Sequence, residues 1–383
     1  MRVKAAILHG KEQIRVEDIA TPALKPGEVR IRVEAALTCG TDLKVFKRGY
    51  HAKMIVPPAV FGHELAGSIS EVAPTHPDPL PRFAAEREKK QEVCGDFASP
   101  RPGGEKVAEG RMRGFDWKIG DRVAVANSAP CGECFHCQVG QENLCEDLLF
   151  LNGAYAESIV VPARIVQKNL LRLRPETEFR DAALVEPLAC VVQGIEDTHL
   201  RAGQHVLILG AGPIGLMFTM LVKQLGCDVT VAGRRVVRLE AAWRLGADHT
   251  IDIGDGRGLV TKVREATRTH FDVVIEAVGH PEIWEAAVHL VRKGGVVNFF
   301  GGCPSGTSIT LDTTLIHYSN LSLLASFHHT PRAIRQALEL IEAGAIRASD
   351  FVDGECPLTR LPELFKSMAA GNQAIKTLIK VHE

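Results

Sequence analysis

The chain has 383 residues, which is long enough for two or three domains that each bury a hydrophobic core. Its 45 basic and 46 acidic residues give a net charge of −1, so no overall field attracts it to nucleic acid or to an anionic membrane. The longest apolar stretch, Val206 to Val222, contains a glycine-rich turn and a proline. This favours a strand followed by a buried helix over a membrane span.

The first part of the chain, residues 1 to about 165, alternates short β-branched runs with glycine and proline turns. We expect this part to be mainly β. The apolar run within Met1 to Gly10 is too short for a signal peptide and is typical of a strand, so we do not expect export. Further strands are predicted over Val29–Ala35, Ser68–Val72 and Arg122–Ala126.

Residues 74–113 interrupt this pattern because they are rich in proline, glycine and charge. We expect a surface insertion that is partly mobile, in which Ala84–Val93 could form a short charged helix. The sequence leaves open whether this insertion contacts substrate, a partner subunit or only solvent.

Four cysteines follow at spacings of two, two and seven residues: Cys131, Cys134, Cys137 and Cys145. This spacing lets four thiolates converge on one tetrahedral zinc ion. Disulfides or unlinked core thiols are the alternatives. Because four thiolates leave the metal no open position, we predict a structural zinc lobe over about 128–148.

From about Leu188 the pattern changes to alternating strands and helices, which predicts a parallel sheet with helices on both faces. The last predicted helix begins with a proline and is followed by Gly344. The predicted strands are Gln204–Leu209, Asp228–Ala232 and Asp272–Ala277, and the predicted helices are Gly215–Leu225, Val237–Leu245 and Pro331–Ala343.

A glycine-rich turn between the first of these strands and its helix predicts dinucleotide binding. The first glycine allows a tight turn, the second lets backbone approach a pyrophosphate, and the third packs helix against strand. The phosphates then lie at the helix N-terminus. The predicted contacts in this turn are Gly210, Gly212, Pro213, Ile214 and Gly215.

The end of the next strand indicates which cofactor binds. An NAD site normally carries an acid there for the ribose, but this chain has Gly233 followed by Arg234 and Arg235. The absence of a carboxylate and the presence of two guanidinium groups suit the 2′-phosphate of NADP, so we predict NADP as the cofactor. Arg238 and Val278 are predicted as further contacts. The alternative is an ordinary solvated turn with exposed arginines.

Several motifs spread along almost the whole chain resemble the zinc-dependent medium-chain alcohol and polyol dehydrogenases, and the sorbitol and threonine dehydrogenase branch in particular. Besides the four cysteines and the glycine turn, these are Cys39-Gly40-Thr41-Asp42, Gly62-His63-Glu64, Gly120-Asp121-Arg122-Val123, Gly153-Ala154-Tyr155-Ala156-Glu157, Glu186-Pro187 and 271–279. The resemblance implies two zinc ions per chain, one structural and one catalytic.

By this resemblance the catalytic zinc ligands are Cys39 and His63, with Glu64 and Glu186 supplying carboxylates directly or through water. Such a mixed, open site lets zinc act as a Lewis acid on an alcohol whose carbon gives hydride to nicotinamide. Thr41 matches the hydroxyl that relays the alcohol proton. Where many relatives continue the relay with histidine, this chain has Lys44, so His51, the nicotinamide ribose or bulk water are open as alternatives.

The resemblance also predicts residues that face the substrate. They are Phe46, Lys47, Arg48, Tyr50, His51, Phe327, His328 and His329. Their polarity favours a hydroxylated or anionic substrate over a simple alkyl alcohol, although the basic residues could equally lie on a solvated loop.

The fold class implied is α/β: a GroES-like β-rich catalytic domain over 1–189 and 331–383, and a Rossmann domain with a doubly wound parallel sheet over 190–330. We expect a cytoplasmic homodimer or homotetramer with a small-molecule alcohol, polyol or carbonyl substrate. The alternatives are a zinc-free quinone or enone reductase and a non-catalytic NADPH-binding structural or sensor protein. The full set Cys39, His63, Glu64 and Glu186 disfavours both.

Overall fold

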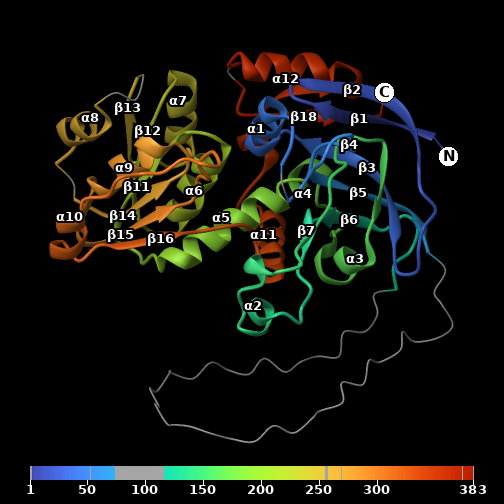
Figure 1. Cartoon of the computed structure of the whole chain (residues 1–383), viewed down its shortest axis with the longest axis horizontal. Coiled ribbons are helices and arrows are strands. Elements are labelled where there is room, and N and C mark those ends of the chain that lie inside the picture. Colours follow the sequence, from blue (N-terminus) through green and yellow to red (C-terminus); the bar gives the residue numbers. More distant parts are fainter. Residues whose placement is uncertain are drawn as a thin grey trace, which may run out of the picture.

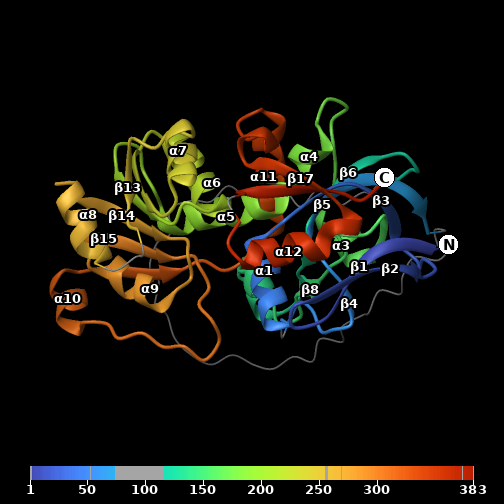
Figure 2. The same ribbon diagram turned by 90° about the horizontal axis from the view of Figure 1, so that it is seen from above.

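The computed structural model describes residues 2–51, 53–73, 116–254, 258–268, 270–372 and 374–382. The predicted insertion at 74–113, including the short helix predicted as an alternative over Ala84–Val93, lies outside these residues. The described chain forms a β-rich part and a part with a parallel sheet, which lie side by side in Figures 1 and 2. None of the helices in the described ranges is both long and apolar enough to cross a bilayer.

The β-rich part is built on a seven-stranded sheet in the order β10-β6-β5-β3-β18-β17, with β9 also paired to β3. Its strands come from both ends of the chain: β3 (Val29–Leu37), β5 (Glu64–Val72), β6 (Arg122–Val125), β9 (Ser158–Val161), β10 (Leu170–Arg172), β17 (Val352–Pro357) and β18 (Lys376–Lys380). The β-branched and aliphatic side chains of β3 are largely buried. A smaller sheet holds β2 (Gln13–Ala20), β1 (Arg2–Gly10) and β4 (Ala59–Val60), and β7 (Ser128–Ala129) pairs with β8 (Leu149–Phe150).

The second part holds six parallel strands in the order β13-β12-β11-β14-β15-β16. They are β11 (His205–Leu209), β12 (Asp228–Gly233), β13 (His249–Asp252), β14 (Phe271–Glu276), β15 (Val291–Phe299) and β16 (Ser322–Ala325). The strand order reverses between β11 and β14. In a doubly wound sheet this reversal opens a crevice at the carboxyl ends of the strands, where nucleotides bind.

Helices cover both sheets. In the β-rich part they are α1 (Gly40–Arg48), α2 (Phe135–Gln138), η1 (Glu142–Leu144), α3 (Ala163–Asn169), α4 (Phe179–Ala182), η2 (Ala348–Asp350), η3 (Leu358–Arg360) and α12 (Leu361–Ala369). Around the parallel sheet they are α6 (Pro213–Gln224), α7 (Val236–Arg244), α8 (Leu259–Ala266), α9 (Pro281–Val288) and α10 (Thr313–Tyr318). The fold class predicted from the sequence is confirmed.

Two helices join the sheets. In Figures 1 and 2, α5 (Val185–Thr198) and α11 (Pro331–Glu342) lie between them, and both helices pack together. The predicted domain boundary at 189/190 therefore falls inside a continuous helix. Thr330 caps α11 by accepting a hydrogen bond from the Ala333 N–H at 3.2 Å.

The predicted elements agree with the observed ones within a few residues. The greatest difference is in β5, which begins at Glu64 rather than at Ser68. The helix predicted over Gly215–Leu225 begins two residues earlier, because Gly212 is its N-cap and Pro213 its first residue. Proline is favoured there, since its missing N–H has no partner in a first helical turn.

Gly215 sets how closely α6 approaches β11. A Cβ atom added there would lie 1.8 Å from the Gly210 carbonyl oxygen, whereas one added at Gly212 would meet nothing within 4 Å. Gly212 has a φ of −83° that any residue can adopt.

We therefore expect Gly215→Ala to reduce the free energy of unfolding by about 1–3 kcal/mol through overpacking. Gly212→Ala is the matched control and should leave stability within about 0.5 kcal/mol. Urea unfolding of both variants measures this. Equal losses of stability would contradict the proposed close approach.

Candidate active site

The pairing of β3 with β5 brings the first candidate metal ligands together. Leu37 near the end of β3 pairs with Glu64 at the start of β5, so Cys39 lies close to His63 and Glu64. Cys39 is the N-cap of α1, and its Sγ accepts the N–H of Thr41 at 3.4 Å. Ligand atoms of the three side chains all lie within 4.8 Å of one another. We call Cys39, His63 and Glu64 the catalytic trio.

Asp42 fixes the orientation of His63. The His63 Nδ1 lies 2.9 Å from Asp42 Oδ1, and both side chains are buried. The second carboxylate oxygen of Asp42 accepts a hydrogen bond from the Tyr155 hydroxyl at 2.6 Å. Because a carboxylate only accepts, His63 carries its proton on Nδ1 and leaves the Nε2 lone pair for a metal.

Lys376 on β18 holds one oxygen of Glu64. Its ammonium group contacts Glu64 Oε2 and donates to the Thr38 carbonyl at 2.8 Å. The other oxygen, Glu64 Oε1, is buried and has no hydrogen-bond partner. Burial raises the pKa of the Glu64 carboxyl group, and Lys376 opposes this shift. A buried oxygen without a partner suits a metal ligand.

The catalytic trio therefore fits zinc by its chemistry. Thiolate, imidazole and carboxylate are ligands that zinc accepts, and three protein ligands leave a position for substrate. Glu186, predicted from the family resemblance to serve the same ion, is not part of this group. Its carboxylate clusters instead with His328 and His329, and burial raises its pKa to about 7.

The four-cysteine lobe lies around α2 (Figure 1) and brings its sulfurs together. The Sγ–Sγ distances are 3.9 Å for Cys131–Cys137, 3.6 Å for Cys134–Cys137 and 3.9 Å for Cys134–Cys145. Four sulfurs held about 2.3 Å from a tetrahedral ion lie about 3.8 Å apart. Hydrogen bonds from the N–H groups of Glu133 and Cys134 lower the pKa of the Cys131 thiol to about 6. These cysteines fit one closed zinc site.

The glycine-rich turn lies at the carboxyl end of β11. Gly210 has a φ of +115°, a backbone conformation that favours glycine, and its Cα faces the Val278 side chain. The loop that follows β14 is held by Glu276, whose Oε1 accepts the N–H groups of Val278 and Gly279 at 2.8 and 2.9 Å. The open space beside Gly212 leaves room for a pyrophosphate at the N-terminus of α6.

Gly233 at the end of β12 has no room for a side chain. A Cβ there would lie 2.7 Å from the Ala211 Cβ and 3.1 Å from the Ala211 nitrogen. An acid that binds a ribose hydroxyl therefore cannot occupy this position without moving the glycine turn.

The three predicted arginines differ in their partners. Arg235 donates to the Asn372 carbonyl at 2.6 Å and Arg238 to the Ala374 carbonyl at 2.9 Å. These bonds connect the nucleotide-binding part to the segment before β18. Arg234 is exposed, and no hydrogen bond or ion pair joins it to another described residue. Each guanidinium carries five N–H groups, so all three retain donors for a ligand.

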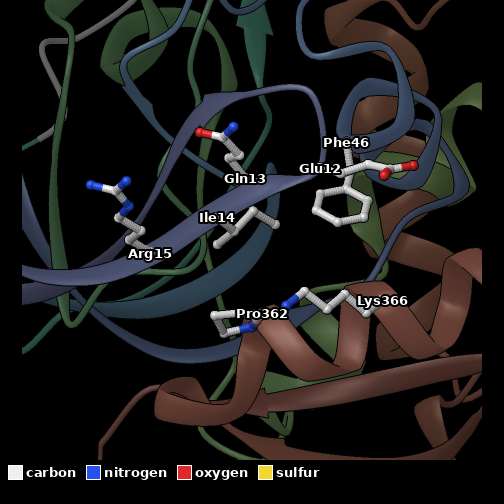
Figure 3. Close-up of a pocket in the computed structure, with 7 residues that line it drawn as sticks. All are labelled: Glu12, Gln13, Ile14, Arg15, Phe46, Pro362 and Lys366. Carbon is white, nitrogen blue, oxygen red and sulfur yellow. The ribbon is translucent and has the colours of Figure 1, made fainter.

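The prediction that Phe46 faces the substrate is wrong. Phe46 is 1% exposed and packs against Phe365 of α12, with ring centroids 5.6 Å apart. It contributes to a separate cavity of about 290 Å³ between the β1–β2 hairpin and α12 (Figure 3). Helical periodicity explains the error, because Phe46 lies on the buried face of α1 with Asp42 and Val45.

The neighbours of Phe46 behave differently. Lys47, Arg48 and Tyr50 are exposed and His51 is half-buried. Lys44, which takes the place of the expected relay histidine, donates to the Gly302 carbonyl at 3.1 Å. This bond crosses from α1 to the nucleotide-binding part.

Three residues of the site were not predicted: Asp42, Tyr155 and Lys376. Asp42 and Tyr155 lie within the motifs that carry the family resemblance. The sequence therefore pointed to both residues, but it did not predict the hydrogen bond between them. Lys376 is separated from Glu64 by 312 residues, and no local pattern distinguishes it from other lysines.

We expect Cys134→Ser to lower the zinc content by one equivalent and to reduce Tm by at least about 5 °C, roughly 2 kcal/mol for a domain of this size. The reason is that the lobe is held by its metal. Metal analysis and thermal unfolding measure both effects. Cys303→Ser, outside either metal group, is the control, and unchanged zinc content in Cys134→Ser would refute the assignment.

Comparison with known families agrees with this geometry. A family model described as zinc-binding dehydrogenase matches residues 213–343. A second, described as the alcohol dehydrogenase GroES-like domain, matches residues 25–84 and 103–170. Together the two matches include the catalytic trio, the four cysteines and the last three residues of the glycine turn, from Pro213 to Gly215.

Individual relatives extend the similarity over most of the chain. Sorbitol dehydrogenase of Bacillus subtilis is 27% identical, with 98% of this chain and 97% of the relative covered. D-altritol 5-dehydrogenase of Agrobacterium fabrum is 30% identical, with 89% of each covered. The crystal structure of a putative zinc-binding dehydrogenase from Sinorhizobium meliloti bound to NADP superposes with a TM-score of 0.80, at 26% identity and 99% coverage of both chains.

Proposed function

Because the chain belongs to the zinc-dependent medium-chain alcohol and polyol dehydrogenases, we propose that it transfers a hydride between a secondary hydroxyl of a polyol, or its ketone, and NADP. The observation that carries this proposal is the buried catalytic trio of Cys39, His63 and Glu64. In a zinc-free reductase or a non-catalytic protein, no metal would compensate a buried carboxylate oxygen without a partner, such as Glu64 Oε1.

We propose that Cys39, His63 and Glu64 hold the catalytic metal. When bound, zinc supplies Lewis acidity, which lowers the pKa of an alcohol oxygen in contact with it. Asp42 keeps the His63 lone pair in place, and Lys376 limits the movement of Glu64. The four-cysteine lobe would hold a second zinc that takes no part in turnover.

Thr41 is proposed to accept the proton of the substrate hydroxyl. It lies in the first turn of α1, and its N–H is bonded to the sulfur of Cys39, so its position is fixed relative to the trio. Lys44 stands where many relatives have the next histidine of the relay, and its ammonium group is bonded to the Gly302 carbonyl. A different group would therefore have to pass the proton on. The Nδ1 of His51 accepts N–H groups of Lys53 and Met54 at 3.3 and 3.2 Å, which leaves its Nε2 for proton transfer.

A polyol is favoured by the polar groups near the trio. Ser128 and Asn127 are buried there, and their side chains bond to His328 and His329. The buried Nδ1 of His329 has no hydrogen-bond partner among the described residues, and a simple alkyl alcohol without further hydroxyl groups would leave it so, which disfavours such a substrate. The sorbitol and altritol dehydrogenases among the relatives support the same substrate class.

NADP is favoured over NAD by the end of β12. Gly233 has no space for a ribose-binding acid, and Arg234 is exposed with its donors free of described partners. A guanidinium can bind a 2′-phosphate through two parallel hydrogen bonds. The relative from Sinorhizobium meliloti, whose structure contains NADP, supports this preference.

The remaining proposals concern assembly and organisation. We propose a cytosolic homodimer or homotetramer, because zinc thiolates favour a reducing compartment and the family resemblance implies association. We also propose that the catalytic domain comprises 1–189 and 331–383 and the cofactor domain 190–330. All six strands of the parallel sheet lie within the latter range.

Activity on a panel of sorbitol, altritol, xylitol, threonine and ethanol with each cofactor tests the proposed function. We expect the highest kcat/KM with a polyol and NADP. Activity on ethanol alone, or on no member of the panel at full zinc content, would refute the polyol proposal.

For the cofactor, Arg234→Ala should raise KM for NADP by roughly 10- to 100-fold through loss of a charge-assisted contact. It should leave KM for NAD nearly unchanged, since NAD has no 2′-phosphate. Arg244→Ala, which removes an arginine at the far end of α7, is the matched control. A parallel loss with both cofactors, or a wild-type preference for NAD, would contradict the assignment.

For the proton relay, Thr41→Val should reduce the hydride-transfer rate by roughly 10²- to 10⁴-fold, the range typical for loss of proton transfer. Zinc content should stay the same, because the Thr41 side chain is not a ligand and its N–H bond to Cys39 is retained. Thr41→Ser restores the hydroxyl and should recover most of the rate. An undiminished rate in Thr41→Val would exclude the relay.

A further inference from the structure

The segment 326–330 connects β16 of the parallel sheet to α11, and we call it the connector. Its residue His329 is 2% exposed, and the Nε2 of this residue lies 3.0 Å from Asn127 Oδ1. Because an amide oxygen only accepts, this Nε2 carries the proton and Nδ1 keeps a lone pair. The Nδ1 atom is buried and has no hydrogen-bond partner among the described residues. The connector therefore presents an acceptor that a substrate hydroxyl can satisfy.

His328, in the middle of the connector, has a strained backbone. Its φ is +62°, in the left-handed region that residues other than glycine rarely adopt. Such a conformation persists only where surrounding contacts hold it. The contacts that hold His328 therefore also decide where the next residue, His329, directs its ring.

The strand pair β7–β8 contacts the side chain of His328 through both strands. Ser128 on β7 and Phe150 on β8 are partners in this pair. The Ser128 hydroxyl oxygen lies 2.5 Å from His328 Nε2, and the Phe150 ring centroid lies 5.5 Å from that of His328. Asn127, which contacts His329, immediately precedes Ser128. One short stretch of the chain therefore fixes both imidazole rings.

Asn143 restrains the backbone at the same point. It belongs to η1 in the four-cysteine lobe, and its side-chain amide donates to the Phe327 carbonyl at 2.9 Å. Only the NH₂ end of an amide can pair with a carbonyl oxygen, so the orientation of this side chain is determined. The Phe327 carbonyl is part of the planar peptide that enters His328. A hydrogen bond to its oxygen therefore limits the rotation that φ of His328 describes.

The four-cysteine lobe joins these two sets of contacts. Ser128 lies shortly before Cys131, and Asn143 lies shortly before Cys145. The Sγ of Cys145 accepts the N–H of Cys131 at 3.1 Å, so the two ends of the lobe are held together. The lobe thus keeps β7 and η1 in a fixed relation, and both of them reach the connector. A lobe that only stabilised its own loop would need no bond to the residue before a strained histidine.

We propose that Asn143 is a positioning residue for substrate recognition. Through the Phe327 carbonyl it holds the connector in the conformation in which His329 Nδ1 accepts a hydrogen bond from a substrate hydroxyl away from the reacting carbon. The four-cysteine lobe thereby favours polyols over alcohols with a single hydroxyl, although its own metal site is closed. This role in substrate choice rests on the proposed function, whereas the hold of Asn143 on the connector does not.

The variant N143D of the holoenzyme tests this role by steady-state kinetics at saturating NADP. Aspartate keeps the shape of asparagine but has no N–H to donate to the Phe327 carbonyl. We expect KM for sorbitol to rise about 3- to 10-fold, as for the loss of one hydrogen bond. The kcat for sorbitol should change little. The kcat/KM for 2-butanol, which has a single hydroxyl, should stay at the wild-type value.

Two further variants separate this role from a general loosening of the lobe. Gln138 donates to the Glu133 carbonyl at 2.9 Å within the lobe. Q138E makes the same change from amide to carboxylate as N143D and is the matched control, which should leave KM for sorbitol unchanged. N143Q restores an amide donor and should recover part of the affinity for sorbitol.

Hydrogen–deuterium exchange measured by mass spectrometry follows the connector without reference to activity. Thr330, at the end of the connector, accepts the N–H groups of Ala333 and Ile334 at 3.2 and 3.0 Å. Loosening of the connector exposes these N–H groups to solvent. We expect the peptide 326–334 to exchange faster in N143D than in the wild type, and to exchange at the wild-type rate in Q138E.

Exchange of the peptide 326–334 at the same rate in N143D and in the wild type would overturn the positioning role. Faster exchange with an unchanged KM for sorbitol, or with an equal loss of kcat/KM for sorbitol and 2-butanol, would overturn the role in substrate choice. If the wild type is inactive on every polyol, the proposed function fails, and the exchange rates still decide whether Asn143 holds the connector.

Discussion

The hydrogen bond between Asp42 and His63 is the contact on which the candidate active site depends. It connects α1 to the start of β5 and sets which imidazole nitrogen faces Cys39 and Glu64. Tyr155 bonds to the other oxygen of Asp42, so the carboxylate is satisfied without water. Since a histidine held in this way is pre-organised for a metal, the site needs little rearrangement to bind one.

The second buried charge of the site, Glu64, depends on an element from the other end of the chain. Lys376 on β18 lies beside β3 in the same sheet and reaches Glu64. Removing one member of a buried ion pair typically costs about 3–5 kcal/mol, because the remaining charge loses its compensation. Packing of the sheet and chemistry of the site are therefore linked through this lysine.

Local patterns were sufficient for much of this molecule. The structure of three features depends mainly on residues that are close together in the chain. These features are the four cysteines at close spacing, the glycine turn after a buried strand, and the β-branched runs that form strands. The contacts that the sequence could not predict are those between distant residues, such as Lys376 with Glu64 and Arg238 with Ala374. The error at Phe46 has the same origin, since only the position of α12 decides which face of α1 is buried.

The position of Lys376 also orders events during synthesis of the chain. The four cysteines are complete by residue 145 and belong to one compact lobe, so they can take up zinc while later residues are still being made. The catalytic trio lacks the ammonium group that compensates Glu64 until β18 has been synthesised and has paired with β3. The four cysteines could thus bind a metal during synthesis, before Lys376 reaches Glu64 and completes the charge compensation of the catalytic trio.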